Sequence, residues 1–316
     1  MAYVVSTTRA DGYVVDAAEW TKNTVDNPIA LKALSDAAAK YPCDGRLTLT
    51  SNTPVTTTDV TAATTLYWSP YHGNQLALYS GSAWVGFSQA QLSIDVPATT
   101  SQMYDVFVDY NAGTPVLSLT AWTNDTILAI ARTTQDGVLV LTGSTGKRYV
   151  GSFRTTGVSG QTEDSLVKRY VSNYYNSVAR PMRAVEATNT WTYTIDTYRQ
   201  ANGAAGNQLD FVIGVSEDLV TASCTSTSEN TSASIRRYTA IGLDSTSSPA
   251  TGSTITRAQN AADEAASAVS GYVGFPGIGR HYLAWLERST ATGTSTWLGD
   301  AGGVLALNGI LGWVKG

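Results

Sequence analysis

The chain has 316 residues, of which 43% are hydrophobic and only 14% are charged, and its formal net charge is −5. An acidic chain of this kind argues against a nucleic-acid partner, which requires a basic stripe. No run approaches the ~20 apolar residues of a membrane helix, and the N-terminus lacks the basic and apolar regions of a signal peptide. We therefore expect a soluble chain made in a cytoplasm, without membrane insertion.

Residues 1–62 are expected to form a short N-terminal helical anchor followed by a Thr-rich linker. Asn27 followed by Pro28 is typical of a helix start, and Leu31 and Leu34 then recur on one helical face. Helices this short cannot bury a core of their own. They are expected to dock on the rest of the chain or on a partner.

Residues 63–124 are expected to form a small antiparallel β module. The stretch "YWSPYHGNQLALYSGSAWVGF" (67–87) contains three apolar runs separated by the turn signals "PYHGN" and "SGSA". In the run that follows, alternation places Met103 and Phe107 on one face of a strand and Tyr104 and Val106 on the other. An "NAG" turn then leads into another strand.

Residues 125–316 are expected to form a C-terminal β-sandwich domain, because short strand-like runs recur at close spacing. One or two helices are predicted to interrupt it. One covers 162–176, with Thr162 as its cap, and the other covers 256–271, which Gly271 ends. The fold class predicted for the whole chain is therefore mainly β.

No pattern in the sequence predicts catalysis, a cofactor or a metal site. The motif G-x-S-x-G is missing, and a Ser-His-Asp relay would have to use His72, in a turn, or His281, at a strand start. No Cys or His cluster has the spacing of metal ligands. Neighbouring carboxylates such as Glu163 and Asp164 diverge on a strand and do not share a helical face. We expect a protein that is not an enzyme.

The two cysteines, Cys43 and Cys224, leave two interpretations open. They could form one disulfide, but two thiols make no disulfide framework. Two small buried side chains fit the sequence better.

Aromatic residues are the other candidate signal, with eight Trp and 17 Tyr in the chain. Rings with a polar handle fill strand faces and interfaces, and this explains most of them. Sugar stacking on exposed rings is the alternative. The candidate glycan-contact residues are Tyr67, Trp68, Tyr71, His72 and Trp84.

Three stretches, taken together, resemble structural proteins of tailed-bacteriophage particles. They are "DGYVVDAAEWTKNTVDNPIALKAL", "TTLYWSPYHGNQLALYSGSAWVGF", and the body that begins "RTTQDGVLVLTGSTGKRYVGSF" and continues through "NTWTYTIDTYRQANGAAGNQLDFVIG". The resemblance covers most of residues 10–215. It implies a virion component displayed on the head or tail, commonly a homotrimer with a jelly-roll-like C-terminal domain.

The same resemblance implies an anchor that binds another virion protein through residues 10–40. Its candidate virion-anchoring residues are Trp20, Val25, Ile29, Leu31 and Leu34. The sequence has no long coiled-coil heptads and no β-helical repeats. A compact spike, head fibre or capsid decoration protein is therefore favoured over a long tail fibre.

Three functions remain as hypotheses at this point. The first is a purely structural virion protein, the second a receptor-binding protein that contacts host-surface polysaccharide, and the third a depolymerase that cleaves it. The second predicts that Trp68→Ala or Trp84→Ala abolishes binding to host cells while the trimer stays intact. The third predicts new reducing ends on capsular polysaccharide.

Overall fold

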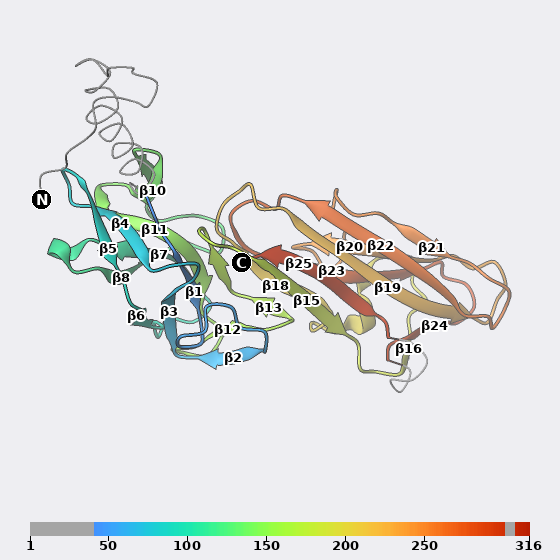
Figure 1. Cartoon of the computed structure of the whole chain (residues 1–316). Coiled ribbons are helices and arrows are strands. Elements are labelled where there is room, and N and C mark those ends of the chain that lie inside the picture. Colours follow the sequence, from blue (N-terminus) through green and yellow to red (C-terminus); the bar gives the residue numbers. More distant parts are fainter. Residues whose placement is uncertain (1–40, 301–306) are drawn as a thin grey trace, which may run out of the picture.

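The structure is a computed structural model that describes residues 41–300 and 307–316. The predicted helical anchor, with its five candidate anchoring residues, lies outside the described residues. The protein is mainly β, with 52% strand and 2% helix. Figure 1 shows an elongated body in which a first lobe, in blue and green, is followed by a second lobe that extends to the red end of the chain.

The first lobe contains three sets of paired strands. The three strands predicted within 67–87 are confirmed and belong to two of these sets. A small sheet has the order β1–β3–β6, and β4 forms a separate hairpin with β5. Their bounds are β1 (Gly45–Thr48), β3 (Thr65–Pro70), β4 (Gln75–Tyr79), β5 (Trp84–Ser88) and β6 (Leu92–Asp95).

A larger sheet of the same lobe has the order β8–β7–β11–β10–β9, with β14 paired to β11. The predicted "NAG" turn is a 3-10 helix, η2, between β7 and β8. The bounds are β7 (Met103–Asp109), η2 (Asn111–Gly113), β8 (Val116–Ala121), β9 (Arg132–Gln135), β10 (Val138–Leu141), β11 (Ser144–Arg154) and β14 (Val171–Asn173).

Strand β7 is buried on both faces, as its alternating pattern predicts. Tyr104 and Val106 pack into a core that also contains Trp68. Phe107 points the other way and packs against Tyr149. The partner β11 begins at Ser144, past the predicted domain boundary at residue 124, so hydrogen bonds of this sheet cross that boundary.

The second lobe is built around two sheets. One has the order β2–β12–β13–β18–β23–β20–β21, with β17 beside β23, and it is antiparallel except where β13 meets β18. Its strands are β2 (Val60–Ala63), β12 (Thr162–Asp164), β13 (Lys168–Arg169), β17 (Arg199–Gln200), β18 (Gln208–Ile213), β20 (Arg237–Leu243), β21 (Thr256–Ala258) and β23 (Gly279–Ser289), and the 3-10 helix η3 (Ala201–Gly203) follows β17.

The other sheet has the order β15–β25–β19–β24–β16, with β22 beside β19, and is wholly antiparallel. The two sheets face each other across a shared core that includes Phe211, Trp285 and Trp297. Its strands are β15 (Ala179–Val185), β16 (Thr190–Thr192), β19 (Val220–Asn230), β22 (Ala266–Gly274), β24 (Ser295–Leu298) and β25 (Gly309–Lys315).

The helix predicted over 162–176 is wrong, because this segment forms β12, β13 and β14. Leu166, placed on the predicted helical stripe, is exposed, and its backbone N–H binds the Asp59 carboxylate at 2.8 Å. Strands β13 and β14 instead pair with β18 and β11. Pairing with strands distant in sequence has overridden a local helical pattern.

The helix predicted over 256–271 is also wrong. Most of this segment lies in β21 and β22, and β22 pairs with β19 along nine consecutive registers. Ala268, Ser270 and Tyr272 are buried while Val269 and Val273 are exposed, which is the two-residue period of a strand. The β-branched valines favour this conformation over the helix that the alanines suggested.

Candidate glycan-contact surface

The loop between β3 and β4 presents two of the predicted aromatic residues to solvent. The ring centroids of Tyr71 and His72 are 3.9 Å apart at an interplanar angle of 49°. Tyr71 is half-buried and His72 is exposed, as expected for a histidine in a turn. His72 has φ 67°, the left-handed region that a non-glycine residue seldom adopts.

This loop is fastened at its base by Asp44. The backbone N–H of Tyr71 donates to the Asp44 carbonyl at 2.7 Å, and the backbone N–H of Gln75 donates to its carboxylate at 2.9 Å. A Cβ at Gly73 would collide with that carboxylate, so a glycine is required there. The aromatic pair is therefore held on a fixed turn.

Arg46 lies behind the pair, and sequence reasoning missed it. Its Cζ is 5.7 Å from the Tyr71 ring centroid, within the range of a cation–π contact. Burial, together with the nearby Arg180, lowers the pKa of Arg46 to about 10. No local signal marks Arg46 in the sequence, because it reaches Tyr71 only through the pairing of β1 with β3, where Gly45 is opposite Pro70 and Arg46 opposite Ser69.

The structure separates Trp68 from the other candidates. Trp68 is 0% exposed, and its ring lies against Gly45, where an added Cβ would overlap it. Tyr67, the next residue of β3, is half-buried and points to the opposite side. Trp68 therefore offers no ring face to a ligand.

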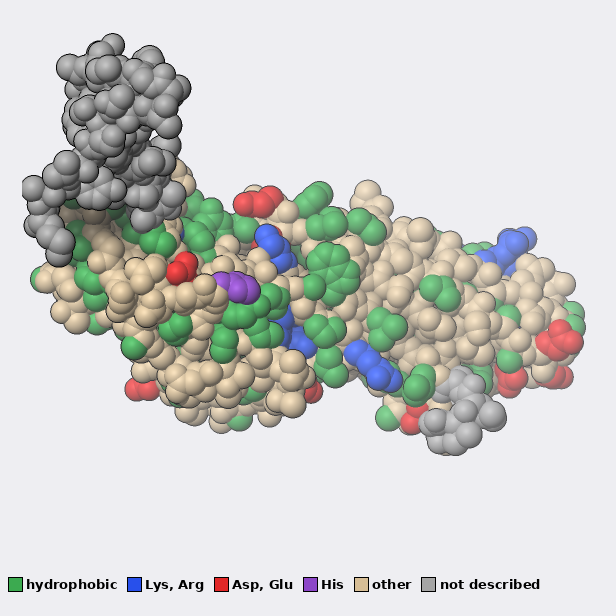
Figure 2. Space-filling view, in the orientation of Figure 1, with side chains coloured by type: hydrophobic (Ala, Val, Ile, Leu, Met, Phe, Trp, Pro, Cys, Tyr) green, Lys and Arg blue, Asp and Glu red, His purple; other side chains and the backbone are tan. Residues whose placement is uncertain are grey.

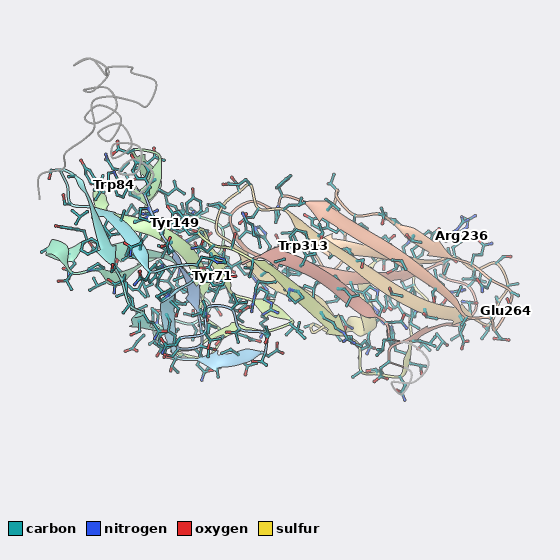
Figure 3. The ribbon with its side chains drawn as sticks, viewed as in Figure 1. Tyr71, Trp84, Tyr149, Arg236, Glu264 and Trp313 are labelled. Carbon is teal, nitrogen blue, oxygen red and sulfur yellow. The ribbon has the colours of Figure 1, made fainter. Side chains whose placement is uncertain are left out.

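Trp84 belongs to a different cluster from the Tyr71–His72 pair, and Figure 3 shows Trp84 and Tyr71 well apart on the first lobe. The indole N–H of Trp84 donates to the Asp136 carboxylate at 2.9 Å. Its ring packs edge-on against Tyr41 at 5.1 Å and Tyr79 at 5.6 Å. These contacts tie the β4–β5 hairpin to the β9–β10 turn and leave Trp84 half-buried.

His281 forms a pair with a carboxylate but no relay. Its Nδ1 lies 2.7 Å from Oδ2 of Asp244, and the side chain is 5% exposed. The Nε2 atom, where a relay would place a hydroxyl, has no hydrogen-bond partner among the residues that the structure describes. This geometry fits the structural role expected for His281.

The acidic residues bind neighbouring cations. Glu163 accepts from Lys168 at 2.9 Å, whereas Asp164 accepts from Arg169 at 2.9 Å and Arg180 at 2.7 Å. The two carboxylates diverge, as expected, although on a strand and not at a helix start. Within 41–300 and 307–316, no group of three or more His, Cys, Asp or Glu residues has the arrangement of a metal site.

The two cysteines are free and buried. Cys43 belongs to the core of the first lobe and Cys224 to the core between the two sheets of the second. Burial raises the pKa of each thiol to about 11. Of the two interpretations, the structure supports small buried side chains.

Fold and surface together define a mainly β protein with a small aromatic pair, the half-buried Tyr71 and the exposed His72. No helix in the described ranges is long and apolar enough to cross a membrane. No protein-family model and no curated protein sequence matches the chain.

Comparison with solved structures finds distant likenesses. The chain is similar to the insecticidal delta-endotoxin Cry8Ea1 from Bacillus thuringiensis, with 7% identity and a TM-score of 0.25, over 90% of this chain and 55% of the toxin chain. A Cry1Da tryptic core variant from Bacillus thuringiensis gives 8% identity and a TM-score of 0.20, over 89% of this chain and 54% of the other. The chain thus spans about half the length of these toxins, and likenesses this distant carry no argument about function.

Proposed function

We propose that the protein is a structural protein of a tailed-bacteriophage virion, displayed on the particle surface as a head fibre, decoration protein or compact spike. The observation that carries the proposal is the combination of three phage-like stretches within residues 10–215. The chain is made in the host cytoplasm and anchors to another virion protein through residues 10–40. It assembles as a homotrimer whose second lobe has a jelly-roll-like sandwich topology.

The composition of the body supports this role. Only 14% of the residues are charged, and two lobes built of sheets leave many strand faces and edges to be covered. Subunits that share such faces around a symmetry axis protect edges that would otherwise aggregate.

Immunogold labelling of purified phage particles, with an antibody against this chain, tests the proposal. Gold on the head would identify a decoration protein or head fibre. Gold at the tail would identify a fibre or spike. Particles without gold, alongside positive labelling of a known virion protein, would overturn it.

A receptor-binding role is the second candidate, and the Tyr71–His72 pair favours it. The exposed His72 ring and the half-buried Tyr71 ring provide a stacking surface for sugars, and the buried Arg46 contacts the Tyr71 ring. If the protein binds host polysaccharide, Tyr71→Ala should abolish binding of the purified protein to host cells, while Tyr238→Ala, a half-buried tyrosine of the second lobe, should leave it intact. Equal binding by both variants would exclude this surface. Release of reducing ends from the polysaccharide would point instead to a depolymerase.

A further inference from the structure

The outer face of the β15–β25–β19–β22 sheet has an unusual composition. The strand registers place its outward side chains in rows that run across all four strands. Among the described residues of the three central rows, Arg183 carries the single charge. One row consists of Pro181, Trp313, Thr221 and Val273, and the next two contain Leu311 and Val269. We call these three rows the apolar face.

Large hydrophobic side chains on the apolar face are open to solvent. Val269 is 56% exposed, Val273 60%, Leu311 49% and Trp313 42%. Figure 2 shows hydrophobic side chains gathered near the middle of the molecule, where Figure 3 labels Trp313. A solvated antiparallel sheet normally carries polar side chains on its outer face, so exposure of this kind marks a surface that binds something.

The opposite sheet shows what a solvated face looks like in this molecule. Arg288 lies over the rings of Tyr198 and Tyr238, with its Cζ 5.4 Å and 5.2 Å from their centroids, and it binds Asp196 at 2.8 Å. Arg280 lies over Tyr282 in the same way, at 5.0 Å. Charged groups therefore cover the apolar surface of that sheet, whereas the apolar face has no such cover in the described chain.

The shape of the apolar face is complementary to a second copy of the same surface. Trp313 stands beside a hollow of about 390 Å³ that Ser223, Gly271 and Val273 help to line. The small residues make the hollow and the indole makes the ridge. When a ridge and a hollow lie side by side on one surface, a twofold or threefold arrangement can place each ridge in the hollow of a neighbour.

The area of the apolar face determines how far an interface must extend beyond it. Four strands about 4.8 Å apart, with about five residues at about 3.4 Å each, cover on the order of 330 Å² before side-chain relief is counted. A stable interface buries about 800 Å² on each partner. The contact must therefore continue onto Phe275 and Leu307, which are 64% and 56% exposed next to the ends of β22 and β25.

We propose that the apolar face is the interface between copies of this chain. The inference deepens the proposed self-assembly of the virion protein and rests on it. Trp313 and Leu311 are the central contacts, and Arg183 lies where it can reach solvent at the edge strand β15. The occupant is a second copy of this chain because its own apolar face, with Arg183 as its single charge among the described residues, supplies a ridge that matches the hollow.

Light scattering coupled to size-exclusion chromatography of the full chain tests this. We expect the wild type to elute as an oligomer, and Trp313→Asp and Val273→Asp each to reduce the mass to that of one chain, 33.4 kDa. Trp313→Phe should keep the oligomer. Val158→Asp is the matched control, because Val158, on a first-lobe loop, is 56% exposed, close to the 60% of Val273. Far-UV circular dichroism shows that each variant is folded.

A monomeric wild type, or an oligomer that survives both Asp variants, would overturn the inference. So would a wild type that stays monomeric until host polysaccharide or another virion protein is added. If the antibody labels particles but the purified chain is monomeric, the proposed function stands and the interface is wrong. If the chain is an oligomer but the antibody never labels particles, the interface stands and the proposed function is wrong.

Discussion

Glu287 is a carboxyl group held in the interior of the second lobe with no exposed surface. It accepts from the Trp191 indole N–H at 2.7 Å, from Arg199 at 2.7 Å and from the backbone N–H of Asn202 at 3.1 Å. Burial raises the pKa of Glu287 to about 7, and the attraction of Arg199 opposes that rise. We expect the pKa to be raised, because Arg199 is one-third exposed and is shared with water, whereas the carboxyl is not.

A raised folded-state pKa means that folding takes up a proton at Glu287. The unfolded carboxyl titrates near 4.3, so the stabilisation is complete below that pH and is lost as the pH rises toward about 7, by at most about 1.4 kcal/mol per pH unit. Glu287→Gln should remove this loss. We expect the wild type to lose free energy of unfolding relative to the variant between pH 5 and pH 7 in urea titrations. A constant difference across that range would contradict the assignment.

Trp68 is a candidate glycan-contact residue in the sequence and a core residue in the structure. Because it is fully buried in the first-lobe core, Trp68→Ala should lower the free energy of unfolding by about 3 to 5 kcal/mol. Val158→Ala, at an exposed site, should change it by less than about 0.5 kcal/mol. Urea denaturation followed by tryptophan fluorescence or circular dichroism measures both. A loss near zero for Trp68→Ala would show that its ring is not a core element.

The burial of many residues could be predicted from the sequence, but which aromatic rings are buried and which reach the surface could not. Alternation in β7 correctly assigned Tyr104 and Phe107 to opposite faces. For Trp68 and Tyr71, three residues apart, composition could not decide which ring is exposed. That depends on the pairing of β1 with β3, which brings Gly45 under the Trp68 indole.

At the scale of elements, one buried arginine holds the β4–β5 hairpin against β11. Arg148, on β11, is 1% exposed and donates to the carbonyls of Ala77 and Pro42 at 2.8 Å and of Tyr41 at 2.9 Å. Each of these carbonyls would lose a donor if the guanidinium were removed, although the Pro42 carbonyl would keep the Ala77 backbone N–H at 2.9 Å. Each buried group left unpaired costs about 1 to 3 kcal/mol.

Arg148→Met should therefore destabilise the first lobe by about 2 kcal/mol or more. The neighbouring Lys147→Met is the control, because Lys147 makes only a part-exposed contact with Asp109 at 3.6 Å and such pairs contribute about 1 kcal/mol or less. Hydrogen exchange should show faster exchange in β4 and β5 for Arg148→Met alone. Unchanged protection there would mean that other contacts hold the hairpin.

Elements were predictable where alternation was strong and misread where it was weak. The strands within 67–87 were bounded by turn residues, and the structure places them accordingly. The alanines of 256–271 and the four-residue spacing of Leu166, Tyr170 and Tyr174 imitated helices. In both cases the deciding partners, β19 for one and β11 with β18 for the other, lie far away in the chain.

At the scale of the whole molecule, the two lobes are joined by more than a linker. The second-lobe sheet continues through β13, β12 and β2, the last of which belongs to residues 60–63. Arg132 of the first lobe donates to the Gly214 carbonyl at 2.5 Å, and Arg180 of the second donates to the Thr56 carbonyl at 2.6 Å.

Because of these connections, we expect the chain to unfold in one transition. Differential scanning calorimetry should give a single peak, for which the calorimetric and van't Hoff enthalpies are equal. Two resolved peaks would show that the lobes are energetically separate.

The position of β25 in its sheet has a consequence for synthesis. This strand lies between β15 and β19 and pairs with both. Along the edges that face β25, its two neighbours therefore lack this hydrogen-bonding partner until β25 has been translated. Between residue 185, the end of β15, and residue 309, the start of β25, a ribosome adding about 5 to 20 residues per second takes on the order of ten seconds. Throughout that interval β15 presents an unpaired edge to other nascent chains on the same message, and β19 does so once residue 230 has been added. Chaperone capture, or early assembly with a sister chain, would have its greatest effect in this window.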